Sequence, residues 1–196
     1  MTSAAFLAGE ESIEAFLGPK LTMADYRRSP EGPPWYELMD GMLLAEPSPT
    51  SGHQSVLLEL ALAMSRAIEG TRGGRLFIAP LDVYLSDHDV LQPDILYVAQ
   101  RRTSIVHPDG IHGAPDLVAE ILSPPNARVT RIKKRAAYAR CGVKEFWLVD
   151  PDVPEIEVYV FPRHRTLPAR RLGIRGVLSS ALLPGFELPL DRLFRR

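Results

Sequence analysis

Apolar residues recur along this chain with two different periods, and together these predict an α/β protein. Over residues 51–69 they follow three- and four-residue intervals, which is the spacing of an amphipathic helix. Leu58 and Leu62 widen the apolar face, so we expect this helix to be largely buried. A second helix is expected over residues 127–140, ending at Gly142.

Short apolar runs rich in β-branched and aromatic residues predict the strands of a central sheet. A hairpin is expected over residues 35–45, with Asp40-Gly41 as its turn. The runs at 76–85 and 90–98 are expected to be adjacent strands, and further strands are expected at 116–122, 144–149 and 156–161. Because no repeat or internal linker is evident, we expect one mixed α/β domain over residues 21–196, preceded by a tail or loosely attached helix over residues 1–20.

Glu120 is the most informative residue, because it places a carboxylate in a segment, residues 116–122, that is otherwise expected to be buried. Burying an unpaired carboxylate is costly, so Glu120 should have a cation or strong hydrogen-bond donors beside it. Asp94 stands in a second apolar run, and Lys133 and Lys134 follow in a basic stretch. Two strand carboxylates and a lysine can hold a divalent metal and position a water, which predicts metal-dependent hydrolysis of an anionic substrate.

The spacing of the carboxylates decides which of them can share one metal ion. Asp116 and Glu120 lie in one strand, with backbones about 13 Å apart at ~3.3 Å per residue, so they cannot both bind directly. Asp94 belongs to another strand, and neighbouring strands are only ~4.8 Å apart. Pro93 favours a bulge that redirects the Asp94 side chain. Asp94 and Glu120 are therefore expected to converge if their strands pair, although an isolated Pro-Asp dipeptide more often marks a turn.

Helical periodicity makes Lys134 a better candidate than Lys133, but it leaves open which face of the helix is buried. Lys134 shares a helical face with residues suited to packing against a sheet, namely Ala137, Tyr138 and Cys141. Lys133 points about 100° away from it. A competing apolar face is formed by Val129, Ile132 and Ala136. For a basic helix, the more common outcome is that both lysines lie at the surface.

Composition narrows the class of protein and of partner. At 196 residues and 45% hydrophobic, the chain can bury a sizeable core as one domain. The sequence shows neither a signal peptide nor an apolar run of membrane-spanning length, so we expect a cytoplasmic protein with no membrane partner. Cys141 is the only cysteine, which excludes an intrachain disulfide and a cysteine-based zinc site. The net charge of −1 counts modestly against nucleic acid, since non-specific DNA binders are typically basic.

Several short motifs occur in order along the chain: residues 36–41, Pro47-Ser48-Pro49, His53-Gln54, Gln92-Pro93-Asp94, residues 118–124, residues 134–138, residues 142–151 and Pro184-Gly185-Phe186. Together they resemble the Uma2 family of putative restriction endonucleases, a branch of the PD-(D/E)XK nuclease superfamily. The resemblance covers nearly everything from Leu21 to Phe194. Each motif is weak alone, but their ordered combination is specific.

The resemblance implies a restriction-endonuclease-like fold, with a central mixed β-sheet flanked by α-helices, and a metal-dependent DNA endonuclease activity. It implies that Asp94 and Glu120 bind Mg²⁺ or Mn²⁺, with the Ile121 carbonyl as a further ligand. In the superfamily pattern a lysine usually stands two residues after the acid, but Leu122 occupies that position here. The resemblance therefore implies that the lysine lies on the next helix, as Lys134, to orient the attacking water and help deprotonate it, or to stabilise charge at phosphorus.

The same resemblance implies roles for further positions. Glu37 would supply another metal ligand or orient a metal-bound water. His53 and Tyr138 are candidates for supporting positions behind the ligands, although a histidine that begins a helix is more often a cap or a packing residue. Many relatives carry an acid in the turn before the lysine, where this chain has Thr130. If that acid anchors the lysine or a second metal, activity here would be weak or absent.

Three hypotheses of function stay open. The first is a metal-dependent DNA endonuclease, acting as a homodimer whose two sites cut two strands. The second is a catalytically inactive nuclease-fold binding or scaffold protein, in which Asp94 and Glu120 pair with residues such as Lys134 and bind no metal. The third is an enzyme of small phosphorylated molecules, but no glycine-rich phosphate loop is evident. The C-terminal region, residues 177–194, would either pack on its own core or dock a second copy.

Overall fold

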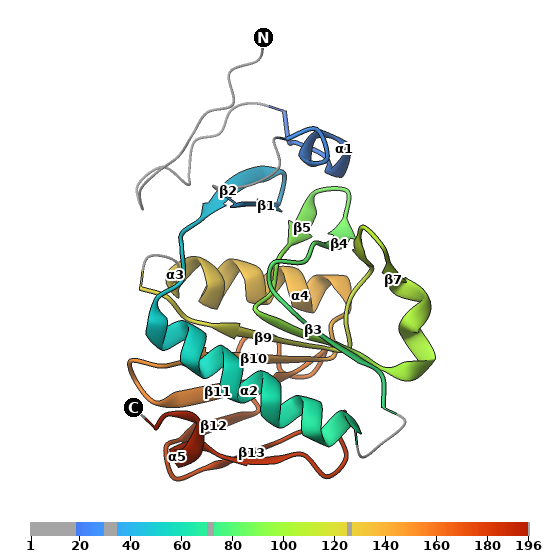
Figure 1. Cartoon of the computed structure of the whole chain (residues 1–196). Coiled ribbons are helices and arrows are strands. Elements are labelled where there is room, and N and C mark those ends of the chain that lie inside the picture. Colours follow the sequence, from blue (N-terminus) through green and yellow to red (C-terminus); the bar gives the residue numbers. More distant parts are fainter. Residues whose placement is uncertain (1–18, 30–34, 70–72, 125–126, 196) are drawn as a thin grey trace.

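A mixed six-stranded sheet forms the centre of the molecule (Figure 1). The computed structural model describes residues 19–29, 35–69, 73–124 and 127–195. Within them, the strands of this sheet lie in the spatial order β12 (Arg170–Gly173), β11 (Glu155–Val160), β10 (Glu145–Asp150), β9 (Leu117–Ile121), β6 (Ile95–Val98) and β3 (Arg75–Ile78). The central pair, β9 and β10, is parallel, and the other neighbours are antiparallel.

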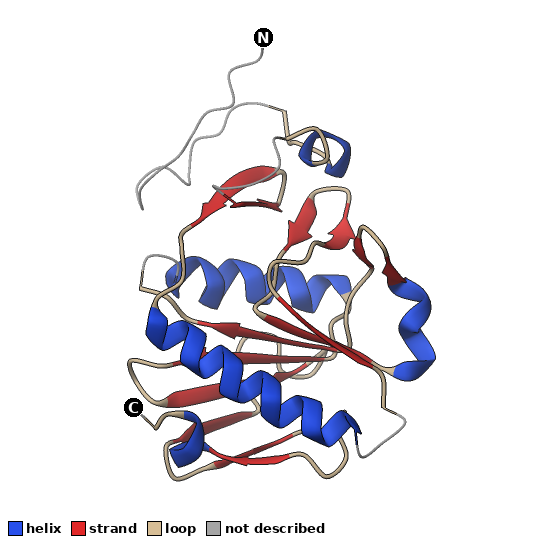
Figure 2. Ribbon diagram, in the orientation of Figure 1, coloured by secondary structure: helices blue, strands red, loops and turns tan. Residues whose placement is uncertain are grey.

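Helices cover both faces of this sheet (Figure 2). The long helix α2 (Ser51–Glu69) packs on one face. The other face carries a helical segment made of α3 (Ala127–Val129), a π-helical turn (Thr130–Lys134) and α4 (Arg135–Cys141). This segment ends at Gly142, whose φ of 97° is favourable for glycine.

A second mixed sheet of six strands lies beyond the α4 side of the first (Figure 1). Its spatial order is β2 (Met42–Glu46), β1 (Trp35–Met39), β5 (Asp89–Leu91), β4 (Val83–Ser86), β8 (Gly110–His112) and β7 (Val106–His107). The hairpin of β1 and β2 turns at Asp40 and Gly41, which both have positive φ, as expected from the sequence. The short helix α1 (Met23–Tyr26) and a 3₁₀ helix (Gln100–Ile105) complete this part.

The alternation of β9 decides where its carboxylate points. Leu117, Ala119 and Ile121 pack into the core on the α2 side, whereas Val118 and Leu122 pack on the α4 side. Because side chains alternate along a strand, Glu120 shares the face of Val118 and Leu122. The strand thus directs Glu120 towards the helical segment that carries Lys134.

The predicted central mixed sheet flanked by helices is present, but the expectation that all the strands lie in it is wrong, because two apolar runs each divide between two sheets. The run at 76–85 forms β3 and β4, and the run at 90–98 forms β5 and β6. Pro80 and Pro93 lie at the two breaks, where a residue without an N–H interrupts the strand. The predicted pairing itself is confirmed, since β3 pairs with β6 and β4 pairs with β5, both antiparallel.

The expectation that α2 is largely buried is also wrong for part of its surface. Leu58 and Leu62 are 57% and 41% exposed, while the buried side chains form one stripe of His53, Val56, Leu57, Leu60 and Met64. At 100° per residue, Leu58 and Leu62 fall about 140° and about 180° around the helix from the centre of that stripe, so they face away from the sheet.

The C-terminal region packs on the chain's own core, which was one of the two alternatives open from the sequence. β13 (Val177–Ser179), β14 (Glu187–Pro189) and α5 (Leu190–Leu193) bury apolar residues against α2 and the central sheet. No helix in the described part of the chain is long and apolar enough to cross a membrane. Residues 1–18, most of the predicted N-terminal tail, lie outside the described residues.

Asp116, directly before β9, has a structural role away from the other acids. Its buried carboxylate contacts Lys144, accepts a hydrogen bond from the Ala99 N–H at 2.8 Å and lies 3.3 Å from Arg102 Nη1. Burial alone would raise the pKa of Asp116, but the Lys144 hydrogen bond, the Ala99 N–H and the Arg102 charge outweigh it and lower the pKa.

Asp116→Asn is therefore expected to destabilise the protein by about 3 kcal/mol at neutral pH, because it leaves the partner cations without their carboxylate. A carboxylate with a lowered folded-state pKa stabilises the protein above its ordinary pKa, and that contribution is lost as the pH falls through the folded value. The difference between wild type and variant should therefore shrink below the ordinary value of 3.8. Urea unfolding across the acidic range checks this, and a pH-independent difference would contradict it.

Candidate active site

A π-helical turn brings Lys134 into the interior. The sequence predicts one continuous helix over residues 127–140, but the turn from Thr130 to Lys134 is π-helical. A π turn inserts a residue into the helical ladder and rotates the helix before the turn relative to the helix after it. Lys134 then shares the buried face of Ala137 and Tyr138, whereas Ile132 is 51% exposed. The competing apolar face left open by the periodicity is therefore not the buried one.

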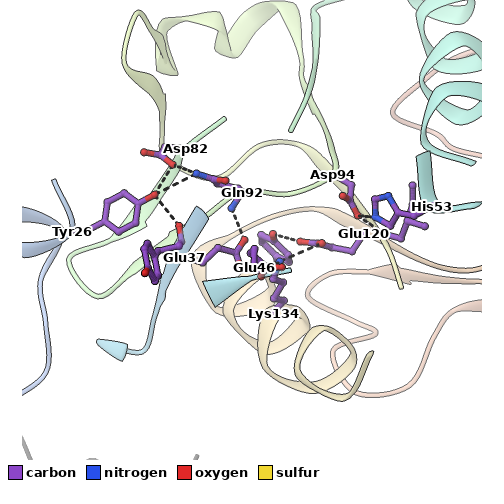
Figure 3. Close-up of polar contacts among 12 residues, drawn as sticks. Tyr26, Glu37, Glu46, His53, Asp82, Gln92, Asp94, Glu120 and Lys134 are labelled. Carbon is purple, nitrogen blue, oxygen red and sulfur yellow. Dashed lines mark hydrogen bonds and ion pairs between the residues drawn. The ribbon is translucent and has the colours of Figure 1, made fainter. Parts of the chain in front are cut away.

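Three carboxylates surround the Lys134 ammonium, which is 4% exposed (Figure 3). Its Nζ lies 2.8 Å from Glu37 Oε2, 3.3 Å from Glu46 Oε1 and 3.5 Å from Glu120 Oε2. These partners come from β1, β2 and β9, so this lysine ties the hairpin of the second sheet to the central strand of the first. We call these four residues the Lys134 cluster.

Glu37 is held within the Lys134 cluster by a second sequence motif. Its Oε1 accepts a 2.6 Å hydrogen bond from the backbone N–H of Gln92, in the segment that links the two sheets. The Gln92 side chain continues outward, donating to Asp82 Oδ1 at 2.8 Å, and the Tyr26 hydroxyl donates to the same oxygen at 2.8 Å (Figure 3). The fully buried Glu37 thus sits between Lys134 and a polar network that reaches α1.

Strand pairing brings Asp94 next to Glu120. The antiparallel register aligns Ile95 with Ala119, so the preceding Asp94 lies opposite Glu120. The Asp94 carboxylate turns back onto β9, where Oδ2 accepts a 2.7 Å hydrogen bond from the Ile121 N–H. Pro93 interrupts the strand pattern directly before Asp94, and Asp94 itself precedes β6. Its side chain is therefore not bound to the regular pleat.

His53 reaches the same carboxylate from the first turn of α2. Its N–H is capped by Thr50 Oγ1 at 3.2 Å, and its side-chain Nε2 lies 3.2 Å from Asp94 Oδ2. Burial on its own lowers the pKa of His53, but the Asp94 hydrogen bond and charge, with Glu120 and the Ile121 backbone, raise it overall. His53 therefore combines the helix-start position expected from the sequence with a direct contact to Asp94.

Tyr138 supports Glu120 from α4. Its buried hydroxyl donates a 2.6 Å hydrogen bond to Glu120 Oε1, and its ring packs against Phe146 with centroids 5.5 Å apart. The two oxygens of Glu120 therefore have separate partners, Tyr138 on one and Lys134 on the other. This fixes the carboxylate in one orientation.

The Lys134 cluster contains one basic group, Lys134, and three acidic groups, Glu37, Glu46 and Glu120. Burial raises the pKa of Glu120 to about 7 against the opposing charge of Lys134, and the charge of Asp94 adds to the rise. Burial likewise raises the pKa of Glu37 well above its ordinary value. Burial alone would lower the pKa of Lys134, but the charges of Glu120, Glu37 and Glu46 raise it well above its ordinary value. The site thus has more negative charge than its own lysine neutralises.

These groups open into a cavity of about 310 Å³. Asp94, Glu120, Lys134 and Glu46 contribute charged groups to its wall, together with His53. Thr130, the position where many relatives are expected to carry an acid, is buried and lines the same cavity. Lys133 does not line it, and Asp116 lies at the opposite end of β9 from Ile121.

The sequence interpretation missed Glu46, although the hairpin contains a signal for it. The ladder pairs Glu37 with Leu44 and Trp35 with Glu46. Because side chains alternate, Trp35, Glu37, Leu44 and Glu46 all lie on one face of the hairpin. Extending the predicted second strand by one residue and applying this register would have placed Glu46 beside Glu37.

The candidate metal ligands do not form a preformed metal-binding cage. In the described part of the chain, no group of three or more His, Cys, Asp or Glu side chains is arranged to hold a metal ion. What the structure does bring together on the wall of one cavity is the side chains of Asp94 and Glu120 and the residue Ile121, whose N–H donates to Asp94.

Comparison with protein families agrees with this arrangement of motifs. Residues 23–191 match the family model of Uma2, described as "Putative restriction endonuclease". The chain belongs to the Uma2 family. That match spans the hairpin of Glu37, the segment of Asp94, the strand of Glu120 and the helical segment of Lys134.

A solved structure shares the fold of this Uma2 protein. It is the crystal structure of a putative nuclease belonging to DUF820 from Anabaena variabilis, with a TM-score of 0.74 and 23% sequence identity. The similarity covers 89% of this chain and 97% of the other. No curated protein matches the chain in sequence.

Proposed function

We propose that this protein is a Mg²⁺- or Mn²⁺-dependent DNA endonuclease with a restriction-endonuclease-like fold. The observation that carries the proposal is the convergence of Asp94, Glu120 and Lys134 on the wall of one cavity, from the residue before β6, from β9 and from the π turn. Membership of the Uma2 family supports a nucleic acid as the substrate.

The donor set fits a hard divalent cation. Carboxylate and backbone carbonyl oxygens, as Asp94, Glu120 and Ile121 provide, are the ligands that Mg²⁺ and Mn²⁺ prefer. Mg²⁺ commonly binds through one or two carboxylates plus substrate phosphates, so a preformed cage of three acidic side chains is not required. Burial raises the pKa of Glu120 and the charge of Asp94 adds to the rise, and a divalent cation beside the two carboxylates would compensate their negative charge. When bound, the ion would lower the pKa of a water and polarise the phosphate.

The residues around Lys134 suit it to charge stabilisation. An ammonium held by three carboxylates keeps its proton, so its role is to orient the attacking water and stabilise charge that develops at phosphorus. Glu37 and Glu46 hold this ammonium in place, and Tyr138 holds Glu120. His53 fixes Asp94 from the other side. Preorganised groups of this kind cost no reorganisation during reaction.

One observation favours the second candidate, a non-catalytic nuclease-fold scaffold. Lys134 contacts Glu120 at 3.5 Å, which is the ion pair that such a scaffold would use in place of a metal. The two candidates differ in what a divalent cation does to the protein. A ligand stabilises the folded state that binds it, whereas a scaffold site closed by its own lysine gains nothing from Mg²⁺.

Glu120→Gln is expected to abolish both metal-dependent stabilisation and cleavage. Wild type should show a rise in Tm with Mg²⁺ or Mn²⁺ and should cut supercoiled plasmid or single-stranded DNA in the same buffers, because Glu120 supplies a ligand. Gln keeps an oxygen for the Tyr138 hydroxyl but lacks the charge, so the variant should fold and fail in both assays. Wild type that neither cuts DNA nor gains stability from either metal would favour the scaffold.

The homodimer and the cytoplasmic location stay predictions.

A further inference from the structure

The mouth of the cavity is apolar and aromatic, unlike its charged floor. Trp35 and Ile78 line the cavity and remain 45% and 50% exposed. Prolines complete this rim, at Pro47, Pro49 and Pro80. We call Trp35, Ile78 and these prolines the apolar rim.

The hairpin register ties Trp35 to the charged floor. Trp35 is paired with Glu46 across the ladder, and directly paired side chains on one face of an antiparallel ladder lie ~4.5–5.5 Å apart at their Cβ atoms. Glu46 in turn contacts Lys134. The indole is therefore one residue pair away from the cluster proposed to act on the phosphodiester.

An exposed tryptophan at such a place needs an explanation beyond packing. The chain has two tryptophans, and Trp147 is fully buried and stacked on Phe186 with centroids 5.6 Å apart. Trp35 has no such burial. Large exposed apolar side chains that rim a polar pocket mark ligand-binding surfaces.

The charge of the cavity argues against affinity from phosphate contacts alone. Among the described residues that line it, Lys134 is the only lysine or arginine, and its ammonium is already surrounded by three carboxylates. Proteins that bind duplex DNA usually obtain their affinity from several lysine and arginine contacts to phosphates. Base stacking on aromatic side chains is the alternative source, and it requires a base that is not already stacked in a duplex.

The geometry points to a single-stranded or unpaired nucleotide as the substrate of this site, with its base stacked on Trp35 and its phosphodiester on the floor formed by Asp94, Glu120 and Lys134. This inference rests on the proposed nuclease function and names its substrate class. Ile78 and the prolines give the remaining apolar contact to the base or sugar. Trp35 thus selects for an unpaired base, because a paired base in B-form DNA presents no free face.

Tryptophan fluorescence tests the contact without relying on cleavage. In EDTA, so that DNA stays intact, a short oligothymidylate should quench the fluorescence of the full-length protein. An abasic oligonucleotide of equal length and a blunt duplex should not. Trp35→Phe leaves only the buried Trp147, so its fluorescence should not respond, while the phenyl ring still supports stacking.

Binding of the same oligothymidylate, measured by anisotropy of a labelled strand, tests the energetic contribution. Trp35→Ala should weaken binding about 10- to 100-fold, and Trp35→Phe should stay within about threefold of wild type. Leu58→Ala removes an exposed apolar side chain that does not line the cavity and should bind as wild type does.

The outcomes separate this inference from the nuclease proposal. No binding, equal quenching by the abasic strand, equal binding of the duplex, or an unchanged affinity in Trp35→Ala would overturn the stacking site. Stacking on Trp35 without metal-dependent cleavage would keep the binding site and reject the nuclease. Cleavage of duplex DNA that is unaffected by Trp35→Ala would keep the nuclease and reject the unpaired substrate.

Discussion

Lys134→Met is expected to lower the free energy of unfolding by about 3–5 kcal/mol, since removing one partner of a buried ion pair leaves uncompensated charge. The ammonium is 4% exposed and lies 2.8 Å from Glu37, 3.3 Å from Glu46 and 3.5 Å from Glu120. Methionine has a similar length and volume, so the loss would come from charge and not from a cavity. Urea unfolding at neutral pH measures it.

Lys133→Met is the matched control, because the adjacent lysine does not line the cavity. That change should alter the free energy of unfolding by less than about 0.5 kcal/mol. Adding Glu37→Gln to Lys134→Met should restore part of the stability, because the variant then removes a cation and an anion together. Equal losses in the two lysine variants, or a double variant whose losses simply add, would show that the Lys134 cluster does not act as one unit.

The same lysine shows how far the sequence could go. An acid in an apolar strand indicated that a cation must lie nearby, and this reasoning is local, because burial of Glu120 and its need for a partner depend on the strand alone. Which lysine supplies the charge depends on the rotation of the helix. The π turn at Thr130–Lys134 sets that rotation. A π turn leaves no signal in a pattern read at 3.6 residues per turn, so periodicity could not decide between the two faces.

The division into two sheets could not be predicted from local sequence patterns either. Pro80 and Pro93 break two strands, but a break does not say that the chain leaves one sheet for another. That outcome depends on pairing between segments distant in sequence, such as Leu38 of β1 with Val90 of β5. This pairing also places the hairpin that carries Glu37 and Glu46 against Lys134. The contact of Glu46 with Lys134 therefore could not be predicted from the sequence, whereas the position of Glu46 beside Glu37 follows from the hairpin register alone.

Asp94→Asn is expected to separate chemistry from folding. Cleavage should fall by about 10³-fold, the size of effect seen when a preorganised electrostatic group is removed from a catalytic site. The free energy of unfolding should change by less than about 1 kcal/mol, because the asparagine carbonyl can still accept from the Ile121 N–H and from a protonated His53 Nε2. The change also removes one negative charge from beside Glu120, whose pKa that charge raises. Plasmid cleavage and urea unfolding measure the two expected effects.

Asp116→Asn is the matched control, since the same chemical change is made at the other end of the Glu120 strand. Its carboxylate neutralises Lys144 and Arg102, so that variant should lose stability while each folded molecule keeps its activity. Asp94→Asn should thus lose activity and keep stability, whereas Asp116→Asn should lose stability and keep activity. The reason is that the negative charge of Asp94 is available to a ligand, whereas that of Asp116 is already neutralised by cationic side chains of the protein. If Asp94→Asn instead loses stability as Asp116→Asn does, and any activity declines only with the folded fraction, both acids are structural and the scaffold is the better description.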